Sequence, residues 1–266
     1  MSAPLVSCLM VTGGRPELVR RSVGCFQRQD HPHKELVILS DDPNDEPDLR
    51  ALEKNDPRVR VAIIEHDPLR RLGGLRNMSM DLARGDWLVQ WDDDDWYGRE
   101  RVSRQLAAAL RAGAGASALK YTLMHMVTAH ETTHSFRGDT GVATPGTILY
   151  RRSDLRYPNL AKNEDGEFLR AARARFGLAI MGAEWSSLYV RIFHGANTWD
   201  EAHFHKRLRR TPRLWLEYQV ANRVRGDLSH HSRFRLRPDE LATLAELAAH
   251  RLDETERVEQ NLEVGA

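Results

Sequence analysis

Cysteine is scarce in this sequence: 266 residues contain only Cys8 and Cys25. Two cysteines exclude the disulfide framework of a small secreted domain and a four-cysteine zinc ribbon. A chain of this length buries a sizeable core without cross-links. We therefore expect one large α/β domain with a tail, in which both cysteines are small, buried and reduced side chains.

Long apolar runs are also missing. No uncharged stretch reaches the roughly 20 residues that span a bilayer. The N-terminal sequence MSAPLVSCLMVTGG has no basic residue before its short apolar run, which is typical of a first β-strand rather than of a signal peptide. We therefore expect a cytoplasmic protein, or one peripheral to the inner membrane, without a transmembrane segment.

Neither sign of charge is in excess, because 39 lysines and arginines face 38 acidic residues and the formal net charge is +1. This balance gives no global field for nucleic acid, which we do not expect as a partner. The chain also lacks a Gly-x-Gly-x-x-Gly fingerprint and a P-loop, which argues against a dehydrogenase or a kinase. Any binding site must therefore be local.

What the first half contains is a succession of short apolar runs and helical patterns. Such a succession favours an α/β fold with a mostly parallel sheet flanked by helices. The predicted strands are 5–11, 35–39, 59–64 and 86–91, and the predicted helices are 16–29 and one around Leu75, Met78 and Leu82. A polar segment separates the second strand from the third.

The second half begins with a predicted helix over 99–111 and an Ala/Gly-rich turn at 112–116, which we interpret as a seam. Further on we predict strands at 118–126, 146–150 and 188–193, a loop around 130–140 and a helix at 164–176. From Pro212 the pattern is helical and charged. Its last amphipathic stretch carries Leu241, Leu244, Leu247 and Leu252.

Four consecutive aspartates, Asp92 to Asp95, follow the strand that ends at Trp91. Like charges this close raise one another's pKa unless a cation offsets them. Carboxylates suit magnesium or manganese, and the carboxyl end of a strand is where open α/β sheets bind ligands. A solvated acidic turn is the simpler interpretation of such a run, but the flanking Trp91 and Trp96 favour a binding site.

The segment DWLVQWDDDDWYGRERVSRQL resembles the strand and DXD motif of family 2 glycosyltransferases of the GT-A fold. The resemblance implies that Asp92 and Asp93 contact the donor ribose, that Asp94 binds Mn2+ or Mg2+ and that Asp95 supports the metal site. It also implies a Rossmann-like GT-A domain over 1–205. Its donor half would be about 1–112 and its acceptor half about 117–205, with a helical C-terminal extension at 206–266.

Three further segments resemble the nucleotide pocket of that family. VSCLMVTGGRPELVRRSVGCFQRQ implies Thr12 and Arg15 beside the base, and ELVILSDDPND implies Asp41, with Asp42 next to it, as the acceptor of a uracil N3–H. GGLRNMSMDLARGDW implies that Arg76 contacts base or phosphate. Taken alone, Arg76 and Asn77 favour a helix start with a surface arginine, but their position one strand before the acidic cluster favours a contact with the nucleotide.

Two later segments resemble the acceptor side. TPGTILYRRSDLRYPNLAKNEDGEFLRAA implies Asp165 as the catalytic base with Glu164 as its neighbour, although two acids also favour the positive end of any helix. LYVRIFHGANTWDEAHF implies His194 as a third metal ligand, although a lone histidine is commonly a structural hydrogen-bonding group. His125, His130 and His134 form no pattern that identifies the acceptor.

The leading hypothesis is an inverting, metal-dependent glycosyltransferase of the hexosyltransferase class. It would use a nucleoside-diphosphate sugar, in the first place a UDP-sugar, and a saccharide, lipid-linked or peptide acceptor. A sugar-phosphate nucleotidyltransferase is the alternative among enzymes, although VTGGRPEL is a poor version of its Gly-rich phosphate loop. A catalytically silent nucleotide-sugar binding module is the alternative outside them. The sugar, the acceptor and the oligomeric state stay open.

Overall fold

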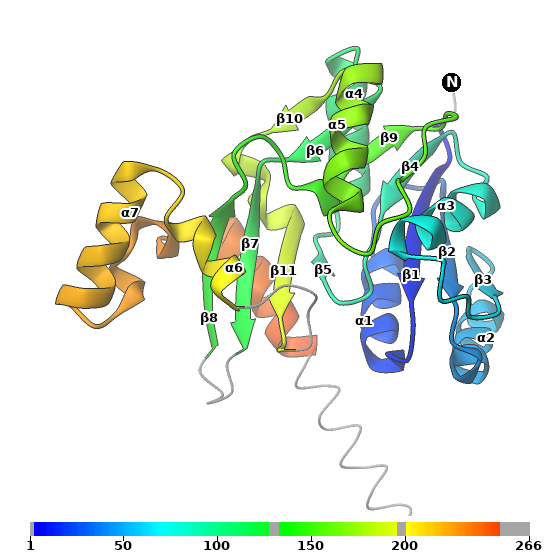
Figure 1. Ribbon diagram of the computed structural model, residues 1–266, viewed down its shortest axis with the longest axis horizontal. Helices are drawn as coiled ribbons and strands as arrows, with labels where there is room; N and C mark the ends of the chain where they lie inside the picture. Colours follow the sequence, from blue (N-terminus) through cyan, green and yellow to red (C-terminus); the bar gives the residue numbers. More distant parts are fainter. Residues whose placement is uncertain (1–2, 128–132, 196–200, 251–266) are drawn as a thin grey trace, which may run out of the picture.

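The computed structural model describes residues 3–127, 133–195 and 201–250. Its centre is a seven-stranded sheet (Figure 1), in the order β10-β6-β9-β4-β1-β2-β3. Within the described ranges only β9 runs antiparallel to its neighbours, so the mostly parallel sheet expected from the sequence is confirmed. The strands are β1 (Val6–Thr12), β2 (Lys34–Ser40), β3 (Val59–Ile63), β4 (Trp87–Gln90), β6 (Ala116–Leu119), β9 (Leu149–Arg151) and β10 (Ala179–Met181).

Helices cover both faces of this sheet, because successive side chains of a strand point to opposite faces. Cys8 and Met10 enter one core, beneath α1 (Pro16–Gln27), α2 (Glu46–Asn55) and α4 (Arg101–Arg111). Leu9 enters the other, beneath α3 (Leu72–Leu82) and α5 (Glu164–Phe176). Cys8 and Cys25 are both buried free thiols, as expected.

A second, four-stranded sheet has the order β5-β11-β7-β8 and lies beside the first (Figure 1). Its strands are β5 (Trp96–Tyr97), β7 (Tyr121–Val127), β8 (Thr133–Asp139) and β11 (Tyr189–Phe193). Met124, Met126 and Phe136 form a small core with Phe204 of α6 (Glu201–His205). The four aspartates connect the two sheets, because they lie between β4 and β5.

The single strand predicted over 118–126 is wrong: the structure has β6 and β7, which belong to different sheets. The chain changes sheet at Lys120, whose N–H donates to the carbonyl of Met181 and whose carbonyl accepts from the N–H of Thr140. Apolar residues continue across this point, so hydrophobic periodicity gives no sign of the break.

The loop predicted around 130–140 is wrong over 133–139, which form β8, while 128–132 lie outside the described residues. β8 pairs antiparallel with β7 alone and buries Phe136 within a polar sequence. The polar segment between β2 and β3 also contains a helix, α2, of which only Leu49 is buried. Both elements carry too few apolar residues for their periodicity to be visible.

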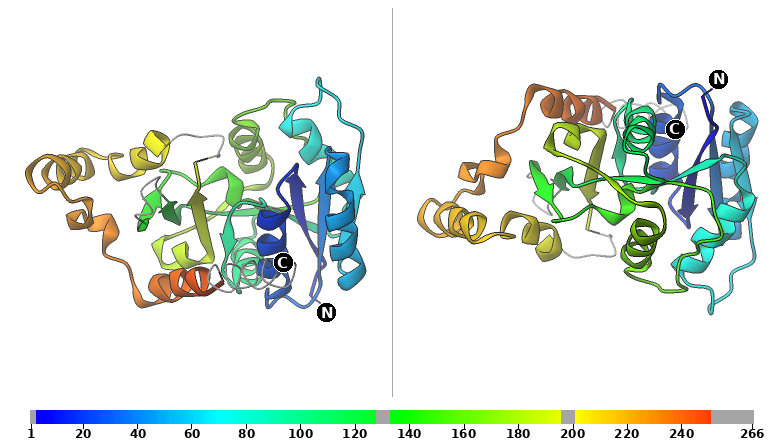
Figure 2. Two further views of the ribbon diagram at one scale, coloured as in Figure 1. Left: turned by 90° about the horizontal axis from the view of Figure 1, so that it is seen from below. Right: turned by 90° about the horizontal axis from the view of Figure 1, so that it is seen from above.

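Beyond the second sheet, the described residues 201–250 are largely helical, in agreement with the helical pattern predicted from Pro212. This region contains α7 (Pro212–Gln219), a π-helical turn at Val220–Val224 and a helix over 238–250. Leu247 enters the first core and Glu246 pairs with Arg28 at 3.3 Å, so this helix packs on α1 (Figure 2). Leu252 lies outside the described residues.

In the part of the chain that the structure describes, no helix is long and apolar enough to cross a membrane.

Candidate active site

The backbone of the acidic turn is fixed by side chains from two neighbouring elements. Ser22 of α1 and Tyr97 of β5 donate to the carbonyl of Asp92 at 3.0 and 2.7 Å, and Arg21 donates to the carbonyl of Asp94 at 2.7 Å. Beneath the turn, Trp91 is fully buried. The four carboxylates therefore occupy defined positions at the carboxyl end of β4.

One pocket collects most of the predicted site residues from segments far apart in the sequence. Asp92 to Asp95 form one wall, Arg15 and Arg76 lie beside them, and Glu164 and Asp165 at the start of α5 complete it. The remaining lining residues are Val11, Leu72, Gln90, Thr144, Gly146, Ala161, Lys162, Asn163, Tyr189, Arg191 and Phe204. The acidic turn and the predicted base thus face a common space.

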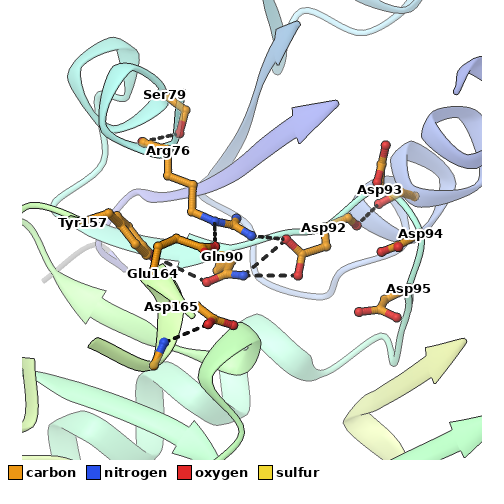
Figure 3. Close-up of polar contacts among 12 residues, drawn as sticks. Arg76, Ser79, Gln90, Asp92, Asp93, Asp94, Asp95, Tyr157, Glu164 and Asp165 are labelled. Atoms are coloured by element: carbon orange, nitrogen blue, oxygen red, sulfur yellow. Dashed lines mark hydrogen bonds and ion pairs between the residues drawn. The ribbon is translucent and has the colours of Figure 1, made fainter. Parts of the chain in front are cut away.

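Arg76 joins these two groups (Figure 3). Its Nε donates to Glu164 and its Nη2 to Asp92, both at 3.0 Å, and the side chain is only 9% exposed. Although burial lowers the pKa of Arg76, Asp92 and Glu164 raise it above its ordinary value. Burial raises the pKa of Glu164, which the Arg76 charge opposes. Arg76 is thus a fixed cation held between two carboxylates.

Asp93 is a buried carboxylate of the acidic turn, and it faces the residues around the end of β1. Thr12 Oγ1 donates to it at 2.6 Å, and Arg15 forms an ion pair with it at 3.1 Å. Burial raises the pKa of Asp93 to about 6 against the opposing charge of Arg15. Thr12 and Arg15, which were predicted to lie beside the base, therefore form one connected group with Asp93, which was predicted to contact the ribose.

Asp94 faces His194, which comes just after β11. Asp94 Oδ2 and His194 Nε2 lie 3.6 Å apart, and each side chain is about one-fifth exposed. Although burial acts to raise it, the adjacent His194 imidazole and the charge of Arg15 hold the pKa of Asp94 below its ordinary value. An ionised carboxylate beside an imidazole is a suitable ligand pair for a divalent cation.

A metal at this point would rely on few protein ligands. Across residues 3–127, 133–195 and 201–250, no group of three or more His, Cys, Asp or Glu side chains could hold an ion together. Mg2+ and related ions commonly keep several waters and bind through one or two carboxylates and the substrate phosphates. Asp94 lines the pocket, whereas His194 lies beside it outside the lining residues. The pair fits a metal held partly by a bound diphosphate.

Asp95 turns toward β11. Its two oxygens accept a hydrogen bond from the Tyr189 hydroxyl and one from the Ile192 N–H, the latter at 3.1 Å. Burial raises the pKa of Asp95 to about 8, and the neighbouring Asp94 charge adds to this effect. These contacts suit the supporting role implied by the resemblance, because they fix the acidic turn against the strand that precedes His194.

Asp165 and Glu164 differ in their surroundings, although both lie in the first turn of α5. Glu164 is 4% exposed and bound to Arg76. Asp165 lines the pocket, and its Oδ1 accepts from the Gly166 N–H at 2.7 Å; within the described ranges it forms no ion pair. Asp165 is therefore the carboxylate of the two that remains available to a ligand.

Asp41 and Asp42 follow β2 and lie close to Gly13 and Gly14, outside the set of residues that line the pocket. Asp41 contacts His66 at 2.9 Å, and Asp42 caps a short 3-10 helix by accepting from the Asn44 N–H at 3.0 Å. The Gly14 N–H donates to a third acid, Asp45, at 3.1 Å. These acids therefore border the β1 turn rather than the acidic turn.

Several residues of the pocket were not predicted from the sequence. Gln90 donates to both oxygens of Asp92 at 3.2 Å, Arg191 projects from β11 into the lining, and Tyr189 holds Asp95. Arg191 carries a signal that could have been used, because an arginine within the apolar strand Tyr189–Phe193 needs a polar partner. Gln90 is similarly a polar residue at the end of a buried strand.

Comparison with known proteins gives a consistent result. Residues 7–157, more than half of the chain, match the family model described as Glycosyl transferase family 2. The putative teichuronic acid biosynthesis glycosyltransferase TuaG of Bacillus subtilis is 27% identical over 123 residues, which are 46% of this chain and 48% of TuaG. The putative colanic acid biosynthesis glycosyl transferase WcaA of Escherichia coli is 32% identical over 106 residues, which are 39% and 37%. The matched region is thus less than half of either relative.

Two solved structures share the fold. TarS of S. aureus, residues 1–349 in complex with UDP-GlcNAc, has a TM-score of 0.58 at 16% identity, over 91% of this chain and 80% of that one. The mannosyltransferase PcManGT of Pyrobaculum calidifontis, in complex with GDP-Man and Mn2+, has a TM-score of 0.53 at 15% identity, over 96% and 80%. With the family match over 7–157, these findings establish that the chain belongs to glycosyl transferase family 2 and has a GT-A fold.

Proposed function

We propose that this protein transfers a sugar from a UDP-linked donor to an acceptor hydroxyl, with inversion at the anomeric carbon and with the help of Mn2+ or Mg2+. The observation that carries the proposal is the common pocket of Asp92 to Asp95, Arg76 and Asp165. The complexes of TarS with UDP-GlcNAc and of PcManGT with GDP-Man and Mn2+ support this class of donor and cofactor.

The donor side follows from the ordered contacts of the turn. Thr12, Arg15 and Asp93 receive the nucleoside, with Asp41 and Asp42 as candidates for the base. Asp94 and His194 would hold the metal, which when bound would neutralise charge that develops on the departing diphosphate. Arg76 keeps Asp92 in position at the edge of this site.

The acceptor side depends on Asp165. An inverting transfer needs a carboxylate that takes the proton of the attacking hydroxyl. Glu164 is occupied by Arg76, whereas Asp165 lines the pocket without a basic partner among the described residues. Asp165 is therefore the proposed base, and Glu164 acts as a neighbour that fixes Arg76.

The acceptor is a saccharide, a lipid-linked saccharide or a peptide. The relatives named for teichuronic acid and colanic acid biosynthesis favour a growing polysaccharide. We place the reaction in the cytoplasm or at the cytoplasmic face of the inner membrane.

The test measures UDP and GDP release from a panel of nucleotide sugars by the full chain with Mn2+, alone and with saccharide acceptors. We expect UDP release from one donor, and loss of release in Asp165→Asn with metal-linked UDP binding retained. Asp81→Asn is the control, because Asp81 is 61% exposed on α3. The proposal would be contradicted if the wild type released no UDP or GDP from any donor, or if Asp165→Asn kept full activity.

A further inference from the structure

The chain concentrates positive charge in one segment. Residues 206–237 contain ten lysines and arginines but only two acidic residues, Glu217 and Asp227. This segment therefore carries a formal charge of +8, although the whole protein carries only +1. A local field of this size attracts anionic surfaces within a Debye length.

The same segment exposes large apolar side chains. Trp215 and Leu216 of α7 are 51% and 59% exposed, and Val220 and Val224 of the turn that follows are 39% and 78% exposed. Leu216, Val220 and Val224 are spaced four residues apart, which places them on one side of a helical segment. Single exposed apolar residues are ordinary, but here three share one side, with Trp215 next to Leu216, and the residues that the structure describes leave this apolar face uncovered.

Three arginines adjoin this face. Arg223, Arg225 and Arg235 are exposed and form no ion pair with any residue that the structure describes. Arg225 and Arg235 also line, with Arg213, Leu216 and Val220, a shallow pocket of about 370 Å³. The lining is mixed, because Ala221 is also apolar whereas Glu217, His230 and Ser232 are polar. Cationic side chains beside exposed apolar ones are suited to a ligand with an anionic head and a hydrocarbon body.

The face is held on a fixed support at one end of the molecule. His231 is fully buried, and its Nε2 lies 3.0 Å from the carbonyl of Leu208 and 3.2 Å from that of Leu214. In the views of Figures 1 and 2, α7 stands at the end of the molecule opposite α2, away from the seven-stranded sheet. A planar surface can therefore approach α7 without meeting α1 or α2.

We propose that residues 206–237 dock the protein on an anionic lipid surface, with Trp215, Leu216, Val220 and Val224 entering the headgroup region and the arginines binding lipid phosphates. A second copy of this chain does not suit the face, because two patches of +8 repel each other. A purely polyanionic partner would use the arginines but would leave the four apolar side chains in water. A bilayer with anionic headgroups satisfies both chemistries.

The docking segment is connected to the pocket through the second sheet. Phe204, which lines the pocket, is followed directly by the basic segment, and Leu208 connects the two through the core of the second sheet. The docking proposal does not require the proposed transfer to be correct, because it rests on the charge and exposure of residues outside the pocket.

The experiment is co-sedimentation of the full chain with vesicles of phosphatidylcholine and with vesicles that also contain phosphatidylglycerol. We expect binding only to the anionic vesicles, weakened by added salt. The double variant Arg223→Glu, Arg225→Glu should lower the partition coefficient by at least about 25-fold, since each arginine near an anionic membrane contributes roughly fivefold. Trp215→Ala with Leu216→Ala should lower it by at least about tenfold.

Two matched controls separate docking from general effects. Arg99→Glu with Arg111→Glu makes the same charge change at exposed positions around α4, and Leu110→Ala truncates a leucine that is 56% exposed there. Both should bind anionic vesicles within a few-fold of the wild type, and thermal unfolding checks that every variant is folded.

The proposal fails if the wild type does not sediment with anionic vesicles, or if the α4 charge control loses binding as much as the docking variant. It also fails if the Trp215 and Leu216 variant binds like the wild type, because the face would then recognise charge alone. Soluble polyphosphate is added as a competitor in low salt. If it removes all vesicle binding and the apolar substitutions have no effect, the face binds a polyanion instead of a membrane.

Discussion

His194 Nε2 lies 3.6 Å from Asp94 Oδ2, although the two residues are one hundred positions apart in the sequence. The pairing depends on Asp95, whose carboxylate holds Tyr189 and Ile192 of β11 and so brings the end of that strand to the acidic turn. A strand from the second sheet thereby completes the site that begins at the carboxyl end of β4.

His194→Ala should weaken metal-dependent UDP binding by at least about tenfold, since loss of a ligand or of its orientation costs a metal site that much. UDP affinity measured without Mn2+ should change little. Calorimetric titration of both proteins in the presence and absence of Mn2+ measures the two effects. His33→Ala, at an exposed position before β2, serves as the control. If Mn2+ tightened UDP binding equally in the wild type, His194→Ala and His33→Ala, His194 would be excluded as a metal ligand.

Arg76→Met should destabilise the protein by about 3 kcal/mol, because it leaves Asp92 and the buried Glu164 without their shared cation. Adding Glu164→Gln should recover part of the loss, since one uncompensated charge is then removed. Urea unfolding of the single and double variants measures this. Arg170→Met removes an exposed ion pair on α5 and should cost less than about 0.5 kcal/mol. If Arg76→Met were as mild as Arg170→Met, the bridge would have no structural role.

Gly73→Ala should destabilise the protein by about 2 to 3 kcal/mol. A Cβ at this position would lie 1.8 Å from the carbonyl oxygen of Pro158, so the backbone of the loop before α5 must shift. Gly24→Ala is the matched control within α1, where the nearest atom is 3.8 Å away. It should stabilise by roughly 0.5 to 1 kcal/mol, as alanine does in a helix interior. Thermal unfolding of both variants measures the contrast, and a neutral Gly73→Ala would contradict it.

Asp56→Asn should lower stability at neutral pH and have a smaller effect in acid. Hydrogen bonds from the Arg58 side chain hold the pKa of Asp56 near 2, against an ordinary value of 3.8. Because the folded-state pKa is depressed, the stabilisation is present above about pH 4 and is lost as the pH falls toward 2. The expected effect at pH 7 is roughly 1 kcal/mol after allowance for solvent screening. Urea unfolding at pH 7 and pH 3 tests it, and an effect that is constant or grows in acid would contradict it.

The sequence predicted β1, β2, β3 and β4 of the central sheet well, because these strands are apolar and bounded by polar or helical segments. It did not predict β10, whose three residues Ala179–Met181 are too few to show a pattern. The helix predicted over 164–176 agrees with α5, since acidic residues open it and Gly177 follows its end. The second sheet could not be predicted in this way. Lys120 marks a change of sheet inside an apolar run, and β8 is polar except for Phe136 and Gly138.

The candidate site was predicted in its parts but not in its connections. Resemblance to the family pointed to Arg76, Asp92 and Glu164 separately, whereas their direct bridge depends on how α3 and α5 pack on one face of the sheet. Gln90 and Arg191 were missed because each lies within a strand that its apolar neighbours define. Their polar contacts exist only once the two sheets are assembled.

The most direct test of this account is calorimetric titration of UDP into the wild type and Asp94→Asn, each with and without Mn2+. We expect Mn2+ to tighten UDP binding to the wild type by at least about tenfold, and to have no effect on Asp94→Asn, because the acidic turn would hold the cation against the diphosphate. UDP binding that Mn2+ does not alter in the wild type, or alters equally in Asp94→Asn, would contradict the account.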